Sequence, residues 1–222
     1  EPLEILERLF PTTSLRRRVE AAENKFRQAN SLRFTNIEGT DILYNLDTKK
    51  NPILTEYGYT TQPGRWDHWP GGFIASLASK NSVNGRVVMG AKDIIFPLKS
   101  YVQENIEFII RDGWVKEING GKKAQELQHF IDSYDDPRAY AVSHIGWGLN
   151  DLCLWDPALP GIGMDGRAHY GNVLFSLGPD TEFGGKNDTP CHLDLPMQAC
   201  NLWLDDDLIV ENGEIVPREM RI

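Results

Sequence analysis

Apolar side chains recur at three- and four-residue steps early in the chain. The members of this stripe are Leu15, Val19, Ala22 and Phe26. Such spacing places side chains on one face of a helix. The polar break at residues 11–14 predicts a helix cap, because Ser and Thr side chains accept hydrogen bonds from the first helical turn. The predicted helices cover residues 3–10, 15–29 and 122–133.

Two dipeptides predict β-hairpins. Asp112-Gly113 and Asn212-Gly213 each separate two apolar runs, and such pairs supply the positive φ angles that a type I′ turn needs. Further strands are predicted over residues 32–36, 42–46, 73–77, 86–95 and 172–177. Because strands outnumber helices and come in hairpins, we expect an α+β domain with a mixed, largely antiparallel sheet and flanking helices.

Composition excludes several classes of function. The chain of 222 residues has 32 Asp and Glu against 23 Lys and Arg, which argues against a nucleic-acid partner. No apolar run approaches the ~20 residues of a membrane span. The three cysteines lack C-x-x-C spacing, which argues against a disulfide framework. We therefore expect the protein in the reducing cytoplasm. The sequence contains no nucleophile-elbow, P-loop or H-E-x-x-H motif.

The firmest candidate site lies in residues 191–195, Cys-His-Leu-Asp-Leu. In an extended segment side chains two apart share a face, so His192 and Asp194 are expected to converge on one point while the leucines face the core. Imidazole and carboxylate are suitable ligands for iron, zinc or manganese. A glycine-rich loop at residues 183–188 precedes the pair and is placed to line a pocket. Cys191 is expected to point away, which disfavours a Cys/His nucleophile pair.

His144 is the second candidate ligand. It ends an apolar run and is followed by two glycines, so the pattern predicts a strand that ends there, where functional groups are often held. With His192 and Asp194 it completes two histidines and one carboxylate. This set leaves coordination positions open and is the ligand triad of non-haem Fe(II) oxygenases. Zinc hydrolases also use such ligands, so the set alone does not name the reaction.

A third histidine lies in an aromatic loop. His68 stands between Trp66 and Trp69, and an imidazole can move protons near neutral pH. The two indole rings are candidates to line a pocket for an aromatic substrate. His129 lies in a helical pattern and His169 in a loop, and we assign both to structure.

Residues 183–194, Phe-Gly-Gly-Lys-Asn-Asp-Thr-Pro-Cys-His-Leu-Asp, resemble the closing motif of the aminopeptidase T-like metallopeptidase superfamily. Residues 32–41 and the terminal Asn-Gly hairpin are similar to it too, so the resemblance spans nearly the whole chain. It implies the fold of that superfamily's C-terminal domain. The chain also begins at Glu1 without a methionine. We therefore expect residues 1–222 to form a single metal-binding catalytic domain, the C-terminal part of a longer two-domain protein.

The chain departs from the peptidases at their metal ligands. His144 stands where they carry a ligand glutamate, Leu174 stands where they carry a ligand histidine, and residues 66–73 lack their metal-binding glutamate. Their two-metal site is therefore largely dismantled, while three ligands for one metal remain. This altered set, with residues 66–72 (Trp-Asp-His-Trp-Pro-Gly-Gly), resembles the 2,5-dihydroxypyridine 5,6-dioxygenases of bacterial nicotinic acid and nicotine breakdown.

The second resemblance implies a function and a ligand set. The implied enzyme is an extradiol-type dioxygenase that opens 2,5-dihydroxypyridine with O2 to N-formylmaleamic acid, with one Fe(II) on the triad, and the superfamily implies a homo-oligomer. The implied site residues are His144, His192 and Asp194 as metal ligands and His68 as acid/base. We also predict Trp66, Trp69 and Asp188 as substrate contacts. Two alternatives stay open. One is a metal-dependent aminopeptidase, and the other is a non-catalytic domain in which the terminal His-x-Asp pair forms an ordinary buried hydrogen bond.

Overall fold

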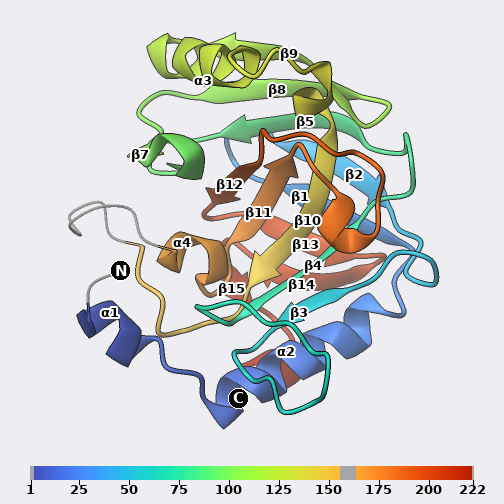
Figure 1. The fold of residues 1–222 in the computed structure, drawn as a ribbon, viewed down its shortest axis with the longest axis vertical. Coiled ribbons are helices and arrows are strands. Elements are labelled where there is room, and N and C mark those ends of the chain that lie inside the picture. The colour runs from blue at the N-terminus through green and yellow to red at the C-terminus, as the bar shows by residue number, and fades with distance from the viewer. Residues whose placement is uncertain (1–2, 156–163, 222) are drawn as a thin grey trace.

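The computed structural model describes residues 3–155 and 164–221, which form two antiparallel sheets and a two-stranded ribbon (Figure 1). The large sheet has the strand order β15 (Glu214–Ile215), β14 (Asp207–Glu211), β13 (Asn201–Leu204), β1 (Ser31–Thr35), β2 (Asp41–Asn45), β5 (Asn84–Met89), β8 (Ile106–Arg111), β9 (Trp114–Gly120). The small sheet has the order β12 (Leu193–Met197), β11 (Val173–Leu177), β10 (Val142–Gly148), β4 (Phe73–Leu77), β3 (Leu54–Glu56). The ribbon pairs β6 (Ile94–Ile95) with β7 (Ser100–Tyr101).

Helices flank these sheets. They are α1 (Leu3–Arg8), α2 (Thr13–Phe26), α3 (Lys122–Asp132) and the single turn α4 (Asp165–Ala168), with 3-10 turns at Phe96–Leu98, Pro137–Tyr140, Thr181–Phe183 and Arg218–Met220. Every pairing between the strands named above is antiparallel. The predicted α+β fold with a largely antiparallel sheet is confirmed. None of the described helices is long and apolar enough to cross a bilayer.

The main core lies between the two sheets. Phe108 of β8 and Phe175 of β11 meet there edge to face, with ring centroids 5.7 Å apart. Ile145 and Trp147 of β10 are fully buried in the same core. Full burial of such a side chain contributes roughly 1.5–3 kcal/mol. Because strand side chains alternate, residues such as His144 project from the opposite face of the small sheet.

The predicted amphipathic helix is present with shifted ends. All members of its apolar stripe are buried. The helix begins at Thr13 and ends at Phe26, instead of spanning residues 15–29. It begins early because the Thr12 side chain accepts a hydrogen bond from the Leu15 N–H at 3.1 Å, which satisfies a donor that the first turn leaves free.

Both predicted hairpins are confirmed. Asp112 and Gly113 have φ angles of 53° and 76° between β8 and β9. Asn212 and Gly213 have φ angles of 47° and 83° between β14 and β15. Two consecutive positive φ angles are the signature of a type I′ turn, whose twist matches that of the flanking strands.

The predicted end of a strand at His144 is wrong, because β10 continues to Gly148. The two glycines that suggested a loop are instead close-packing positions. A Cβ atom at Gly146 would meet the carbonyl oxygen of Ile74 at 2.0 Å, and one at Gly148 would meet that of His169 at 2.1 Å. Glycine in a strand often marks such a close backbone approach.

Two other segments differ from the prediction. The strand predicted over residues 86–95 is divided into β5 and β6 by a turn that contains Lys92 with a φ of 80°. Residues 150–170, for which the sequence predicts no helix or strand, contain α4. Residues 156–163 of that stretch lie outside the described residues.

Asp93 links the turn after β5 to the end of β12. Its side chain accepts hydrogen bonds from the N–H groups of Gly90 at 2.8 Å and Gln198 at 2.9 Å. Asp93 is only 4% exposed. Burial raises the pKa of its carboxyl group to about 7.

This raised pKa predicts a pH-dependent stability. Between about pH 4 and 7 the folded protein keeps a proton on Asp93 that the unfolded chain releases, so the free energy of unfolding should fall as pH rises, by at most about 4 kcal/mol. For Asp93→Asn, the free energy of unfolding measured with urea should change less with pH across this range. The same change at exposed Asp206 is the control. Equal slopes for Asp93→Asn and wild type would contradict the prediction.

Candidate metal centre

His144 reaches the outer face of the small sheet through a β-bulge. The register between β10 and β11 shifts between Val142 and Ile145, and a bulge of this kind re-aims the side chains it contains. The His144 imidazole is 2% exposed. It stacks on the Phe183 ring at a centroid distance of 5.0 Å and meets the Phe73 ring edge to face at 6.1 Å. The ring is therefore held between apolar partners.

His192 and Asp194 share this face, as the alternation of an extended segment predicts. Asp194 lies in β12, and His192 stands just before it. Leu193 and Leu195 are fully buried in the core on the other side, and so is Cys191. The prediction that the cysteine points away from the histidine is confirmed.

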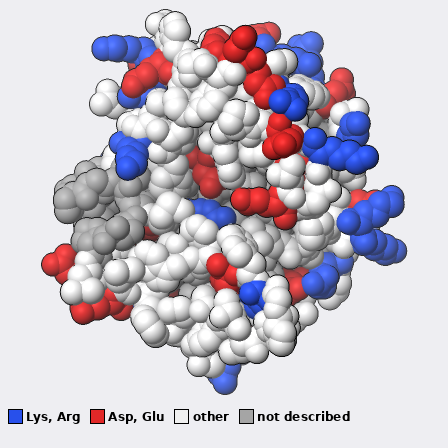
Figure 2. All heavy atoms as spheres, in the orientation of Figure 1, with Lys and Arg blue, Asp and Glu red and all other residues white. Residues whose placement is uncertain are grey.

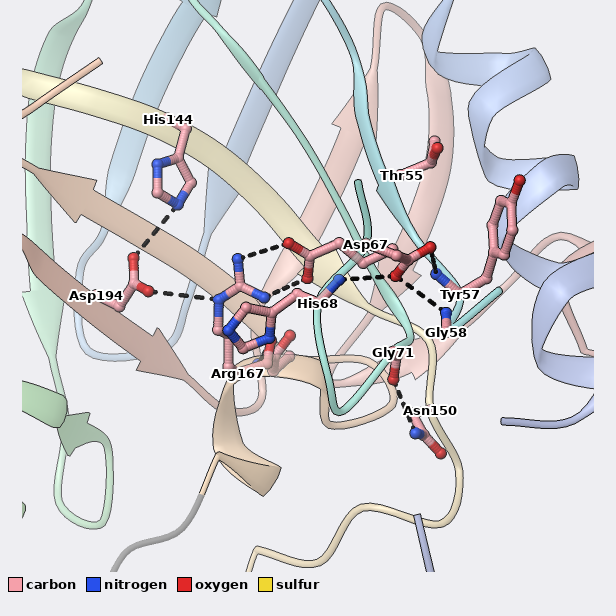
Figure 3. Close-up of polar contacts among 12 residues, drawn as sticks. Thr55, Tyr57, Gly58, Asp67, His68, Gly71, His144, Asn150, Arg167 and Asp194 are labelled. Atoms are coloured by element: carbon pink, nitrogen blue, oxygen red, sulfur yellow. Dashed lines mark hydrogen bonds and ion pairs between the residues drawn. The ribbon is translucent and has the colours of Figure 1, made fainter. Parts of the chain in front are cut away.

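The three candidate ligands meet at one point. Asp194 Oδ1 lies 3.3 Å from Nε2 of His144 and 3.3 Å from Nε2 of His192. One ligand atom from each residue lies within 4.8 Å of the others. Figure 3 shows His144 and Asp194 pointing toward each other from neighbouring parts of the sheet. Strand β11 separates β10 from β12, so the sheet brings together residues that are about fifty positions apart in sequence.

These atoms suit a divalent metal. Nε2 of His144 and Oδ1 of Asp194 are buried and have no hydrogen-bond partner among the described residues, although they lie close together. Leaving buried polar atoms unpaired costs free energy, and a cation between them removes that cost. Ligands about 2.1 Å from one metal and at right angles lie about 3 Å apart, which is close to the spacing observed. The donor set therefore fits a metal ion.

Charge supports the same conclusion. Burial raises the pKa of Asp194, but His144, His192 and Arg167 outweigh this effect and hold that pKa well below its usual range. Burial lowers the pKa of His192, but Asp194 outweighs it and the pKa is raised. The centre thus presents an ionised carboxylate, and a metal would compete with a proton for His192.

Apolar side chains enclose the centre on the sheet side. They form a buried cluster of Phe73, Ala75, Leu77, Leu174 and Phe183. Leu174 is fully buried in this cluster. Figure 2 shows acidic and basic atoms near the middle of this face of the molecule, surrounded by uncharged surface. The ligands therefore lie in surroundings that strengthen electrostatic interactions.

Asp67 organises the loop that carries His68. Its side chain, 3% exposed, accepts hydrogen bonds from the N–H groups of Gly58 at 3.0 Å, Tyr57 at 3.3 Å and His68 at 2.9 Å. Arg65 adds an ion pair at 2.8 Å. Figure 3 shows the His68 imidazole pointing toward Arg167, which contacts Asp194. Nδ1 of His68 is buried without a hydrogen-bond partner among the described residues.

The three predicted substrate contacts are in different surroundings. Trp66 is 58% exposed, with its ring 6.0 Å from that of His68. Trp69 packs against a small apolar cluster that contains Leu9 and Cys153. Asp188 is exposed, in the loop that follows Phe183. The structure brings none of the three into hydrogen-bond contact with the candidate metal ligands, all of which lie within the described residues.

Comparison with known proteins identifies the family. A family model described as 2,5-dihydroxypyridine 5,6-dioxygenase (NicX) matches residues 1–217. The chain belongs to this family. It is 44% identical, over an alignment of 227 residues, to the 2,5-dihydroxypyridine 5,6-dioxygenase of Pseudomonas putida. That alignment covers 100% of this chain and 64% of the relative, so the chain spans less than two thirds of its relative's length.

Solved structures agree with the NicX family assignment. The structure of the Pseudomonas putida dioxygenase superposes with a TM-score of 0.94 at 44% identity, covering 100% of this chain and 65% of that one. Wild-type AmpT from Thermus thermophilus superposes with a TM-score of 0.62 at 15% identity, covering 96% of this chain and 58% of that one. This second likeness shows a shared fold. The resemblance to the dioxygenases is confirmed, and so is the fold that the resemblance to the aminopeptidase T-like superfamily implied.

Sequence analysis of this NicX-family chain missed two residues of the centre. Arg167 of α4 contacts Oδ2 of Asp194 through Nε at 3.5 Å, and Glu56 of β3 pairs with Arg167. Neither lies in a recognisable motif, and Arg167 falls in a stretch without apolar periodicity. The one available signal was Glu56 itself, a charged residue shortly after the apolar pair Ile53-Leu54.

The Asp67 network predicts that His68 depends on Asp67 for its position. In Asp67→Asn only one side-chain oxygen remains to accept hydrogen bonds from several N–H donors. The free energy of unfolding, measured in urea, should therefore fall by roughly 1–3 kcal/mol. Limited proteolysis should cleave residues 57–72 faster. Asp41→Asn, which disturbs an exposed ion pair with Arg33, is the control and should change neither measurement appreciably. Unchanged cleavage in Asp67→Asn would show that Asp67 does not hold the loop.

Proposed function

We propose that this chain carries the catalytic centre of an Fe(II)-dependent dioxygenase that opens the ring of 2,5-dihydroxypyridine. The observation that supports this most strongly is the meeting of His144, His192 and Asp194 on one face of the small sheet, in a chain of the 2,5-dihydroxypyridine 5,6-dioxygenase family. Two imidazoles and one carboxylate with open positions are typical of non-haem Fe(II) oxygenases. When bound, iron supplies the redox step and a template that orients substrate and O2.

The reaction balances without another reductant. Both atoms of O2 enter the product, the ring bond between C5 and C6 breaks, and the product is N-formylmaleamic acid. The hydroxyl group beside that bond must lose its proton before the ring can donate electrons. We assign this proton to His68, because its buried Nδ1 lacks a partner among the described residues and Asp67 fixes its backbone.

The chain's other side chains shape the substrate site in this proposal. The buried apolar cluster around Leu174 excludes water from the ligand face. Trp66 presents an exposed ring beside His68 and is assigned to cover the pyridine ring together with Trp69. Asp188 is assigned as a polar substrate contact because its loop also carries Phe183, which stacks on His144. The proposal includes a homo-oligomeric state, from the family resemblance.

Oxygen uptake tests this function directly. The chain should consume O2 with 2,5-dihydroxypyridine only after Fe(II) is added, and isotopically labelled O2 should place two labelled atoms in the product. Hydrolysis of a fluorogenic peptide without oxygen would favour the aminopeptidase alternative instead. Absence of bound metal after anaerobic purification with Fe(II) would favour the non-catalytic alternative.

The triad predicts how iron binding depends on single residues. His192→Ala and Asp194→Ala should each abolish stoichiometric iron binding, because two remaining ligands hold a metal poorly. Elemental analysis after anaerobic loading measures this. His129→Ala is the matched control, since His129 is exposed on α3 and bonds to the Gln125 carbonyl of its own helix. Full iron content in His192→Ala would refute the ligand assignment.

The proton-transfer role predicts a different behaviour for His68. His68→Ala should keep its iron but lower turnover roughly 10²–10⁴-fold, the usual contribution of one general base. Iron content and oxygen uptake on the same sample separate the two effects. Loss of iron would make His68 a ligand, and unchanged turnover would remove it from the reaction.

A further inference from the structure

A buried ion pair stands directly behind the candidate metal ligand Asp194. Arg167 of α4 contacts both carboxylate oxygens of Glu56, through Nη2 to Oε1 at 3.0 Å and through Nη1 to Oε2. The Glu56 side chain is 0% exposed and that of Arg167 is 8% exposed. A bidentate pair fixes the plane of the guanidinium as well as its position. Arg167 therefore has a defined orientation in the core.

The two oxygens of Asp194 have separate partners. Oδ2 faces Nε of Arg167 at 3.5 Å. Oδ1 faces the two imidazoles, each at 3.3 Å. Figure 3 shows Arg167 between Asp194 and the segment that carries Asp67 and His68. The guanidinium thus takes up one oxygen and leaves the other turned toward the point where the histidines meet.

Burying these charged groups costs free energy. Buried ions lose hydration, and replacing a buried ion pair by apolar side chains is often neutral or stabilising. Here one guanidinium faces two carboxylates, from Glu56 and Asp194, so the buried group keeps one negative charge uncompensated by arginine. A divalent cation at the imidazoles supplies the missing positive charge.

A direct role for Arg167 in holding an anionic substrate is less consistent with the contacts. The Nη1, Nη2 and Nε atoms of Arg167 each face a carboxylate oxygen. The guanidinium carbon also lies 4.5 Å from the centroid of the Phe73 ring, which covers one of its faces. These contacts engage all three nitrogens in ordering the protein itself.

We infer that Arg167, locked by Glu56, is a positioning residue that restricts Asp194 to a single metal-binding oxygen. By occupying Oδ2 it turns Oδ1 toward His144 and His192, and it keeps the second oxygen from taking a coordination position needed by substrate or O2. The inference rests on the metal centre of the proposed function. It goes beyond that function because two residues outside the ligand set, Arg167 and Glu56, determine that Asp194 binds the metal through one oxygen.

Cobalt binding tests this without relying on turnover. Co2+ added to the metal-free chain gives visible absorption bands that report the number and arrangement of its ligands. The main variant is the double change Arg167→Met with Glu56→Leu, which removes both ions of this pair so that neither of the two is left buried alone. We expect its Kd for Co2+ to rise about 10–100-fold, as for other partners of metal ligands, with altered bands.

Two further variants complete the design. Glu56→Gln keeps a hydrogen-bond acceptor for Arg167 but loosens the bidentate pair, and should weaken Co2+ binding several-fold even where the double variant fails to fold. Arg33→Met disrupts an exposed bidentate pair with Asp41 and should leave Kd and bands unchanged. Circular dichroism of each variant verifies that the fold is retained.

The outcomes separate this inference from the proposed function. Wild-type Kd and bands in folded double and Glu56→Gln variants would overturn the positioning role, while the proposed function would stand. A raised KM for 2,5-dihydroxypyridine with unchanged Co2+ binding would make Arg167 a substrate contact and also overturn it. Failure of the wild type to bind Co2+ any better than His192→Ala would refute the metal centre itself.

Discussion

The centre depends on keeping the Asp194 carboxylate ionised where little water reaches it. Burial alone favours the neutral acid, and the fold opposes this by surrounding the carboxylate with His144, His192 and Arg167, which hold its pKa well below the usual range. An ionised carboxylate and two imidazoles with a shared focus are what a divalent metal requires. The rest of the site follows from this constraint, because these groups are delivered by three separate elements, β10, the segment entering β12, and α4.

The antiparallel sheet delivers them through simple geometry. Side chains alternate along each strand, so one face of the small sheet packs on the core and the other carries the ligands. The bulge in β10 and the close packing allowed by Gly146 set where His144 emerges. The strong core on one face makes the other face rigid, and a rigid scaffold holds ligand atoms at the separations a metal needs.

The fold of this chain is shared more widely than its sequence. The likeness at 15% identity concerns the fold alone, whereas the 44% identity with the Pseudomonas putida dioxygenase extends over the whole of this chain. Leu174 occupies a buried apolar cluster on the ligand face, where a second metal would need polar ligands. Function on such a scaffold is decided by the few residues of this face.

The sequence by itself determined the local features whose causes are local. The type I′ turns, the apolar stripe of α2, and the shared face of His192 and Asp194 follow from periodicity and turn chemistry, and the family motif pointed to His144. Only the tertiary structure decided that β10 runs past His144, since the reason is the approach of Ile74 and His169 to two glycines. Arg167 and Glu56 are 111 positions apart, and no pattern along the chain records a pairing whose cause is the packing of α4 against the small sheet.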